Sequence, residues 1–181
     1  MAMNLANKLT ILRVILIPIF LVVLMSEFIS SPYNRYIAIL IFVIASLTDM
    51  LDGYIARSRN LITNFGKFMD PLADKLLVSA AMIAMVEMGD LPSWVVIIII
   101  SREFTITGFR ILAIEANKVI AASWWGKVKT TIQMVMIIYI LFDFKGFIFD
   151  IIANILIMLA TIFTIISGID YIIKNKDVLK G

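Results

Sequence analysis

The chain has 181 residues, of which 62% are hydrophobic and only 16% are charged, and its mean hydropathy is +1.02. This composition excludes an ordinary soluble domain and predicts an integral membrane protein without a separate soluble domain. The chain contains no cysteine and no histidine, which excludes disulfides, thiolate chemistry and imidazole ligands. Any metal binding or proton transfer must therefore use carboxylates.

Six apolar stretches follow one another along the chain, and each predicts one transmembrane helix. Glycine, proline and serine residues separate several of them, with Gly66 and Pro71 before the third, as is typical of short connections. We therefore expect an all-α integral membrane fold with six transmembrane helices in one bundle, forming a single domain over residues 1–181. The stretches centre on residues 12–25, 36–48, 76–86, 94–100, 131–142 and 147–173.

The basic residues predict the orientation of these helices. With six spans, both termini and the second and fourth loops lie on one side of the membrane. Of the 16 basic residues, only Arg35 and Lys145 fall on the other side. Because cytoplasmic loops carry an excess of lysine and arginine, we expect a multi-pass cell-membrane protein with both termini in the cytoplasm.

Four aspartates are the most unusual feature of this apolar chain, since one acidic side chain at mid-bilayer costs about 2.5–3.5 kcal/mol. Asp49 and Asp52 share one face of the second predicted helix, and Asp70 and Asp74 share one face at the start of the third. A short connection makes these helices antiparallel neighbours, so both pairs can converge at the cytoplasmic surface. Carboxylates that close together repel unless they protonate or bind a cation. The pattern favours a site for one or two Mg²⁺ or Mn²⁺ ions, although Asp70 before Pro71 also fits a helix N-cap.

Two glycines and an arginine accompany the aspartates. Gly53 and Gly66 each remove a side chain where a bulky ligand can approach a helix closely. Arg57 provides a forked donor that suits phosphate oxygens. Carboxylates, divalent metals and an arginine are typical of displacement at phosphorus.

Together these residues resemble the complete signature of the CDP-alcohol phosphotransferases. In that family a membrane enzyme transfers a phosphatidyl or related group from a CDP-linked donor to an alcohol and releases CMP. The resemblance implies that the four aspartates hold two divalent cations around the donor pyrophosphate and that Asp74 is the candidate base for the acceptor hydroxyl. It further implies a homodimer and a nucleotide pocket shaped by Gly53, Ala56, Arg57 and Gly66. The matching positions are Asp49-x-x-Asp52-Gly53-x-x-Ala56-Arg57-x8-Gly66-x-x-x-Asp70-x-x-x-Asp74.

Other polar segments resemble the bacterial phosphatidylglycerophosphate synthases within that family, which use glycerol 3-phosphate. Five basic residues between positions 102 and 129 exceed what two metals and one pyrophosphate need, which indicates a second anionic substrate. We expect CDP-diacylglycerol as the donor, with Asn7 and Thr10 in its site, glycerol 3-phosphate as the acceptor, and no nucleic acid partner. The candidates for the acceptor phosphate are Arg13, Arg102, Arg110, Lys127 and Lys129.

Several alternatives remain open at this point. The same transfer to serine, inositol phosphate or phosphatidylglycerol would use the same aspartates. A divalent-cation transporter would need acidic residues near the midplane of several helices, whereas the motif places its acids at one membrane face. Arg102 and Glu103 also fit simple interfacial positions.

Overall fold

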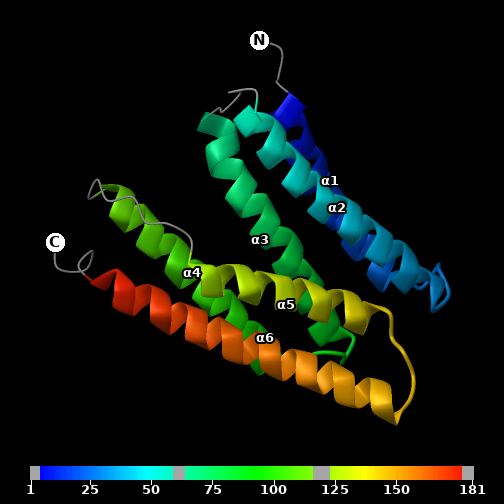
Figure 1. The fold of residues 1–181 in the computed structure, drawn as a ribbon. Helices are drawn as coiled ribbons and strands as arrows, with labels where there is room; N and C mark the ends of the chain where they lie inside the picture. The colour runs from blue at the N-terminus through cyan, green and yellow to red at the C-terminus, as the bar shows by residue number, and fades with distance from the viewer. Residues whose placement is uncertain (1–4, 59–63, 116–122, 177–181) are drawn as a thin grey trace. The chain divides into compact units, whose positions relative to one another are not determined.

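The computed structural model describes residues 5–58, 64–115 and 123–176, except for the side chains of residues 5–7, 49–58, 64–71, 74 and 114–115. The described ranges contain helices and no strand, which confirms the all-α prediction and its six helices (Figure 1). The helices are α1 (Leu5–Met25), α2 (Tyr33–Ser58), α3 (Asn64–Glu87), α4 (Ser93–Glu115), α5 (Trp124–Leu141) and α6 (Phe147–Lys174).

The start of α3 differs from the sequence prediction. Gly66 and Pro71 were expected to precede the third helix, but α3 begins at Asn64 and continues through both. The reason is visible in the sequence, because apolar residues at positions 65, 68, 69 and 72 have helical spacing. Asp70 is therefore the seventh residue of α3 and not its N-cap.

The chain divides into two compact units, the first formed by Met1–Met88 with Leu141–Asp143. In this unit α1 contacts both α2 and α3. Phe20 on α1 and Phe42 on α2 pack with their ring centroids 6.0 Å apart. The short segment Leu141–Asp143 is held by an ion pair of 3.8 Å between Arg35 Nε and Asp143 Oδ2. Helices α1 to α3 therefore form one packed group around buried aromatic and aliphatic side chains.

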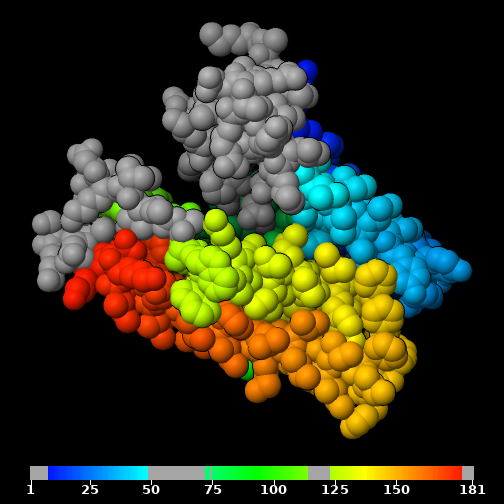
Figure 2. All heavy atoms as spheres, viewed as in Figure 1, coloured from blue at the N-terminus to red at the C-terminus, as the bar shows by residue number. Residues whose placement is uncertain are grey.

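The second unit is formed by Gly89–Ile140 with Phe144–Gly181. Within it α4 contacts α6, and α5 runs antiparallel to α6. At one end of α5, the Trp125 ring centroid lies 5.9 Å from that of Phe163. At the other end, Tyr139 Oη donates a hydrogen bond of 3.2 Å to the Phe149 carbonyl. Figure 2 shows the surfaces of α5, in yellow-green, and α6, in orange, in contact along this face.

Two of the described helices are long and apolar enough to cross a membrane, judged by length and composition. They contain the windows Lys8–Met25 in α1 and Phe147–Lys174 in α6, while Tyr33–Thr48 in α2 is a shorter apolar segment. Only 22% of each window is buried, so most of these apolar side chains face outward, as lipid-contacting residues do. These helices support membrane association. The six-span arrangement stays a prediction.

Candidate active site

The four aspartates lie at similar distances from the end of α2 and the start of α3. Asp52 lies six residues before the end of α2 and Asp70 six residues after the start of α3, which places each about 9 Å from its helix end at 1.5 Å per residue. Asp49 and Asp74 lie nine and ten residues from the same ends, or about 14 and 15 Å along the axis. The two helices contact each other in the first unit. The backbone therefore supports two levels with two aspartates each, while the carboxylates themselves lie outside the described side chains.

This arrangement fits hard divalent cations. The motif offers only carboxylate oxygens, and the whole chain has no histidine or cysteine to add nitrogen or sulfur. Mg²⁺ and Mn²⁺ prefer oxygen ligands of this kind. Among the side chains that the structure describes, no other group of three or more acidic residues is placed to hold a metal ion.

The residues assigned to the nucleotide surround the aspartates along the same two helices. Gly53, Ala56 and Arg57 lie in the last two turns of α2, and Gly66 lies in the first turn of α3. Asn7 lies in the first turn of α1. The side chains at these five positions are outside the description, and their roles stay predictions.

Thr10 and Arg13 of α1 are described and fully enclosed, with 1% and 0% exposure. Arg13 Nε donates a hydrogen bond of 3.2 Å to the carbonyl of Ala45 on α2, one turn before Asp49. This bond places the guanidinium inside the first unit. The other four candidates for the acceptor phosphate all belong to the second unit.

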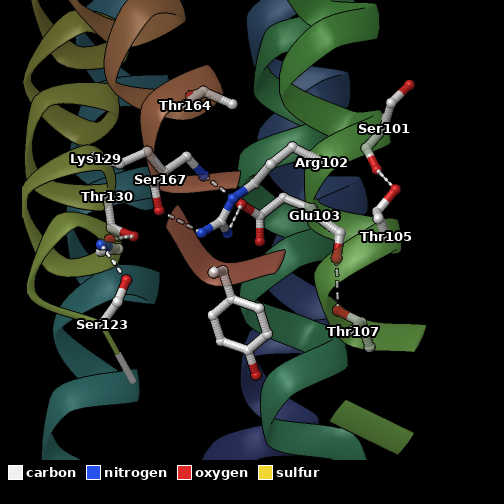
Figure 3. Close-up of polar contacts among 12 residues, drawn as sticks. Ser101, Arg102, Glu103, Thr105, Thr107, Ser123, Lys129, Thr130, Thr164 and Ser167 are labelled. Carbon is white, nitrogen blue, oxygen red and sulfur yellow. Dashed lines mark hydrogen bonds and ion pairs between the residues drawn. The ribbon is translucent and has the colours of Figure 1, made fainter. Parts of the chain in front are cut away.

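A polar network joins the three helices of the second unit (Figure 3). Glu103 Oε1 accepts a hydrogen bond of 3.1 Å from Arg102 Nη1 on α4 and a second from Lys129 Nζ on α5. Arg102 Nη2 donates at 2.6 Å to Ser167 Oγ on α6. Lys129 is only 3% exposed. Arg102 and Glu103 are therefore not solvated charges, since both side chains are largely enclosed in this network.

Two glycines make room for the Arg102 side chain. A Cβ atom at Gly168 on α6 would lie 3.3 Å from Arg102 Cγ, and one at Gly126 on α5 would lie 3.9 Å from Arg102 Nη2. By contrast, a Cβ at Gly108 on α4 would meet no heavy atom within 4 Å. The approach is tight at Gly168, where a larger residue would push against the Arg102 side chain. At Gly126 the distance to Arg102 is an ordinary van der Waals contact, and at Gly108 there is open space.

Arg110 and Lys127 differ from Arg102 and Lys129 because their side chains are exposed. Arg110 Nε donates a hydrogen bond of 3.4 Å to Tyr171 Oη on α6. The four candidates for the acceptor phosphate in the second unit therefore form two sets. Arg102 and Lys129 form an inner pair that shares Glu103, and Arg110 and Lys127 form an outer pair with accessible charges.

Sequence reasoning did not identify Ser167 and Tyr171, although α6 carries a signal that marks them. Its buried polar and small residues recur every three or four positions, at Thr161, Thr164, Ser167, Gly168 and Tyr171. Such a stripe on the most apolar helix predicts a face that packs against polar groups of neighbouring helices.

Comparison with known proteins agrees with the motif. The model of the CDP-alcohol phosphatidyltransferase family matches residues 3–166. The chain is 44% identical to the CDP-diacylglycerol–glycerol-3-phosphate 3-phosphatidyltransferase of Bacillus subtilis (strain 168), over 98% of this chain and 97% of the relative. It is also 44% identical to the Haemophilus influenzae protein of the same name, over 99% and 97%. Identity to the probable phosphatidylglycerophosphate synthase of Mycobacterium tuberculosis (strain H37Rv) is 41%, over 94% and 81%. This chain therefore belongs to the CDP-alcohol phosphatidyltransferase family.

Proposed function

We propose that this protein transfers the phosphatidyl group of CDP-diacylglycerol to glycerol 3-phosphate, giving phosphatidylglycerophosphate and CMP, a step of phospholipid biosynthesis. The observation that carries the proposal is the 44% identity, over nearly the whole length of both chains, to relatives named for this reaction. The complete aspartate motif supports the same class of reaction.

The donor site is assigned to the connected ends of α2 and α3. Asp49, Asp52, Asp70 and Asp74 are the ligands for two divalent cations, either Mg²⁺ or Mn²⁺. When bound, such cations neutralise charge on the pyrophosphate oxygens and help to align the reacting groups. Arg57 donates to a donor phosphate oxygen. The nucleotide pocket is lined by Asn7, Thr10, Gly53, Ala56 and Gly66.

A groove in the first unit supports a lipid-linked donor. It has a volume of about 550 Å³ and is lined mainly by aliphatic side chains of α1 and α3, among them Ile17, Leu21 and Ile83. On α3 its lining begins at Leu76, two residues beyond Asp74. An acyl chain of the donor can therefore lie against apolar side chains while its pyrophosphate is near the aspartates.

The acceptor site is assigned to the basic residues of the second unit. The phosphate of glycerol 3-phosphate binds the outer pair, Arg110 and Lys127, and the inner pair, Arg102 and Lys129, adds positive potential. Arg13 is buried in the first unit, and its positive charge contributes to the attraction of the acceptor phosphate.

The reaction itself is a displacement at the β-phosphorus of the donor. The primary hydroxyl oxygen of glycerol 3-phosphate forms a bond to this phosphorus, while the bond between the phosphorus and the oxygen of the leaving CMP breaks. The hydroxyl proton passes to Asp74. Coordination to a metal makes a carboxylate a weaker base. Asp74 therefore acts either as the base that takes this proton or as a group that orients the hydroxyl while the proton passes to water.

Purified protein in detergent, supplied with Mg²⁺ and CDP-diacylglycerol, tests the proposed reaction through CMP release. We expect CMP with glycerol 3-phosphate and little with serine, inositol phosphate or phosphatidylglycerol, and we expect EDTA to abolish the release. Faster release with another alcohol would reassign the acceptor. A protein that releases CMP with none of them would not be this kind of enzyme.

We also propose that the protein spans the membrane six times, with both termini and the active site on the cytoplasmic side, and that it is a homodimer. Because the chain has no cysteine, one introduced cysteine reports its own location. In intact cells, a membrane-impermeant maleimide should label Ser31→Cys between α1 and α2 but not Lys176→Cys after α6. The reverse pattern would mean that the orientation is inverted.

The mass of the detergent-solubilised protein tests the proposed homodimer, and a monomeric mass would exclude it.

A further inference from the structure

Of the two arginines in the second unit, Arg110 is the one whose charge is accessible to a ligand. Its side chain is exposed, and within the described part of the chain its hydrogen bond and its ring contact are both with Tyr171. Its Nε donates to Tyr171 Oη, and its terminal nitrogens Nη1 and Nη2 have no acceptor among the described residues. These two nitrogens form the planar edge with which arginine binds a phosphate through two hydrogen bonds.

The inner pair is less available. Arg102 uses Nη1 for Glu103 and Nη2 for Ser167, and Lys129 is 3% exposed and bonded to the same carboxylate. A phosphate that bound these groups directly would have to displace Glu103 from two largely buried cations, which is costly. The phosphate is therefore expected to bind the outer pair, Arg110 and Lys127, directly.

Tyr171 is rigidly placed beneath Arg110. It is 2% exposed and belongs to a buried cluster with Ile106 and Phe109. The Phe109 ring meets it edge-on, with centroids 6.0 Å apart and an angle of 84° between the rings. Arg110 Cζ lies 5.9 Å from the centroid of the Tyr171 ring, within the range of a cation–π contact. The ring and the hydroxyl together hold one edge of a flexible, exposed guanidinium against a fixed surface.

We propose that Tyr171 is a positioning residue for the acceptor: it holds Arg110 by Nε so that the Nη1–Nη2 edge is free for the phosphate of glycerol 3-phosphate. This inference rests on the proposed function. It adds a residue of α6 that contacts no substrate and acts through Arg110. A pre-oriented guanidinium loses less conformational entropy on binding, which favours affinity for the acceptor without changing the chemical step.

The test compares Tyr171→Phe with the wild type in the CMP-release assay. Phenylalanine keeps the packing against Phe109 and removes only the hydroxyl. We expect the KM for glycerol 3-phosphate to rise about fivefold, as loss of one long hydrogen bond to a charged group predicts. The kcat and the KM for CDP-diacylglycerol should stay the same. Tyr139→Phe is the matched control, because its hydroxyl donates to the Phe149 carbonyl within the same unit, and its KM values should not change.

A double-mutant cycle separates positioning from a general structural effect. Arg110→Ala should raise the KM for glycerol 3-phosphate by about 50-fold, and Tyr171→Phe should add nothing in the Arg110→Ala background. Two results would contradict the inference, provided that the wild type uses glycerol 3-phosphate normally: the two effects multiply, or Tyr171→Phe alone leaves this KM unchanged. In either case the inference is wrong and the proposed function stands. A wild-type enzyme that releases no CMP with glycerol 3-phosphate overturns the proposed function and this inference together.

Discussion

Asp74→Asn is expected to lower the kcat of CMP release by about 10²- to 10⁴-fold, the usual contribution of a positioned acid or base. Asparagine keeps an oxygen at the same place but has no negative charge and cannot accept the hydroxyl proton. The KM for glycerol 3-phosphate should change little, because the acceptor phosphate binds the second unit. Steady-state rates of CMP release at saturating glycerol 3-phosphate measure the effect.

The dependence of this variant on metal concentration distinguishes the two roles of Asp74. If Asp74 acts mainly by holding a cation that orients the hydroxyl, high Mg²⁺ or Mn²⁺ should restore part of the rate. If it is the base, added metal should restore none. Asp150→Asn is a suitable control, since Asp150 is exposed in the first turn of α6 and outside the motif. Undiminished CMP release by Asp74→Asn would contradict both roles.

Glu103→Leu is expected to lower the free energy of unfolding by about 3 kcal/mol, the lower end of the range for breaking a buried ion pair. The lower value applies because the Arg102 and Glu103 side chains retain 14% and 19% exposure. The variant deprives two cations of their shared carboxylate, whereas Lys129→Met leaves Glu103 paired with Arg102 and should cost less. Thermal unfolding in detergent measures both effects.

The double variant Glu103→Leu with Lys129→Met tests the assignment of the network. Removing one of the two cations that Glu103 pairs with should recover part of the stability that Glu103→Leu loses. Lys127→Met provides the matched control, because Lys127 lies on the same helix and is exposed, so its loss should change stability by less than about 0.5 kcal/mol. If Glu103→Leu unfolds at the wild-type temperature, Glu103 does not stabilise the second unit.

Local sequence patterns predicted much of the helical architecture. The number and order of the helices follow from apolar runs separated by glycine, proline and serine, and the structure confirms them. The start of α3 was missed because Gly66 and Pro71 were given more weight than the helical spacing of the apolar residues around them. Helix ends depend on such competing signals within one or two turns.

The aspartates and the basic residues of the candidate site differ in how much of their arrangement the sequence could predict. The aspartates could be grouped from spacing alone, because positions three or four apart share a helical face and a short connection makes the two helices neighbours. The basic residues could only be listed, since spacing does not say which of Arg102, Arg110 and Lys129 is buried. Separating the inner pair from the outer pair required their partners on α5 and α6.

By itself, the sequence determined the membrane class, the helices and the aspartate motif with its family, because composition and helical periodicity are properties of short stretches of chain. Only the tertiary structure decided that Arg102 and Lys129 share Glu103 and that Tyr171 lies beneath Arg110. Lys129 and Glu103 are separated by 26 positions, and Arg110 and Tyr171 by 61. Contacts over such separations depend on how helices pack, as where Gly168 of α6 lies against Arg102 of α4, and no local pattern encodes that packing.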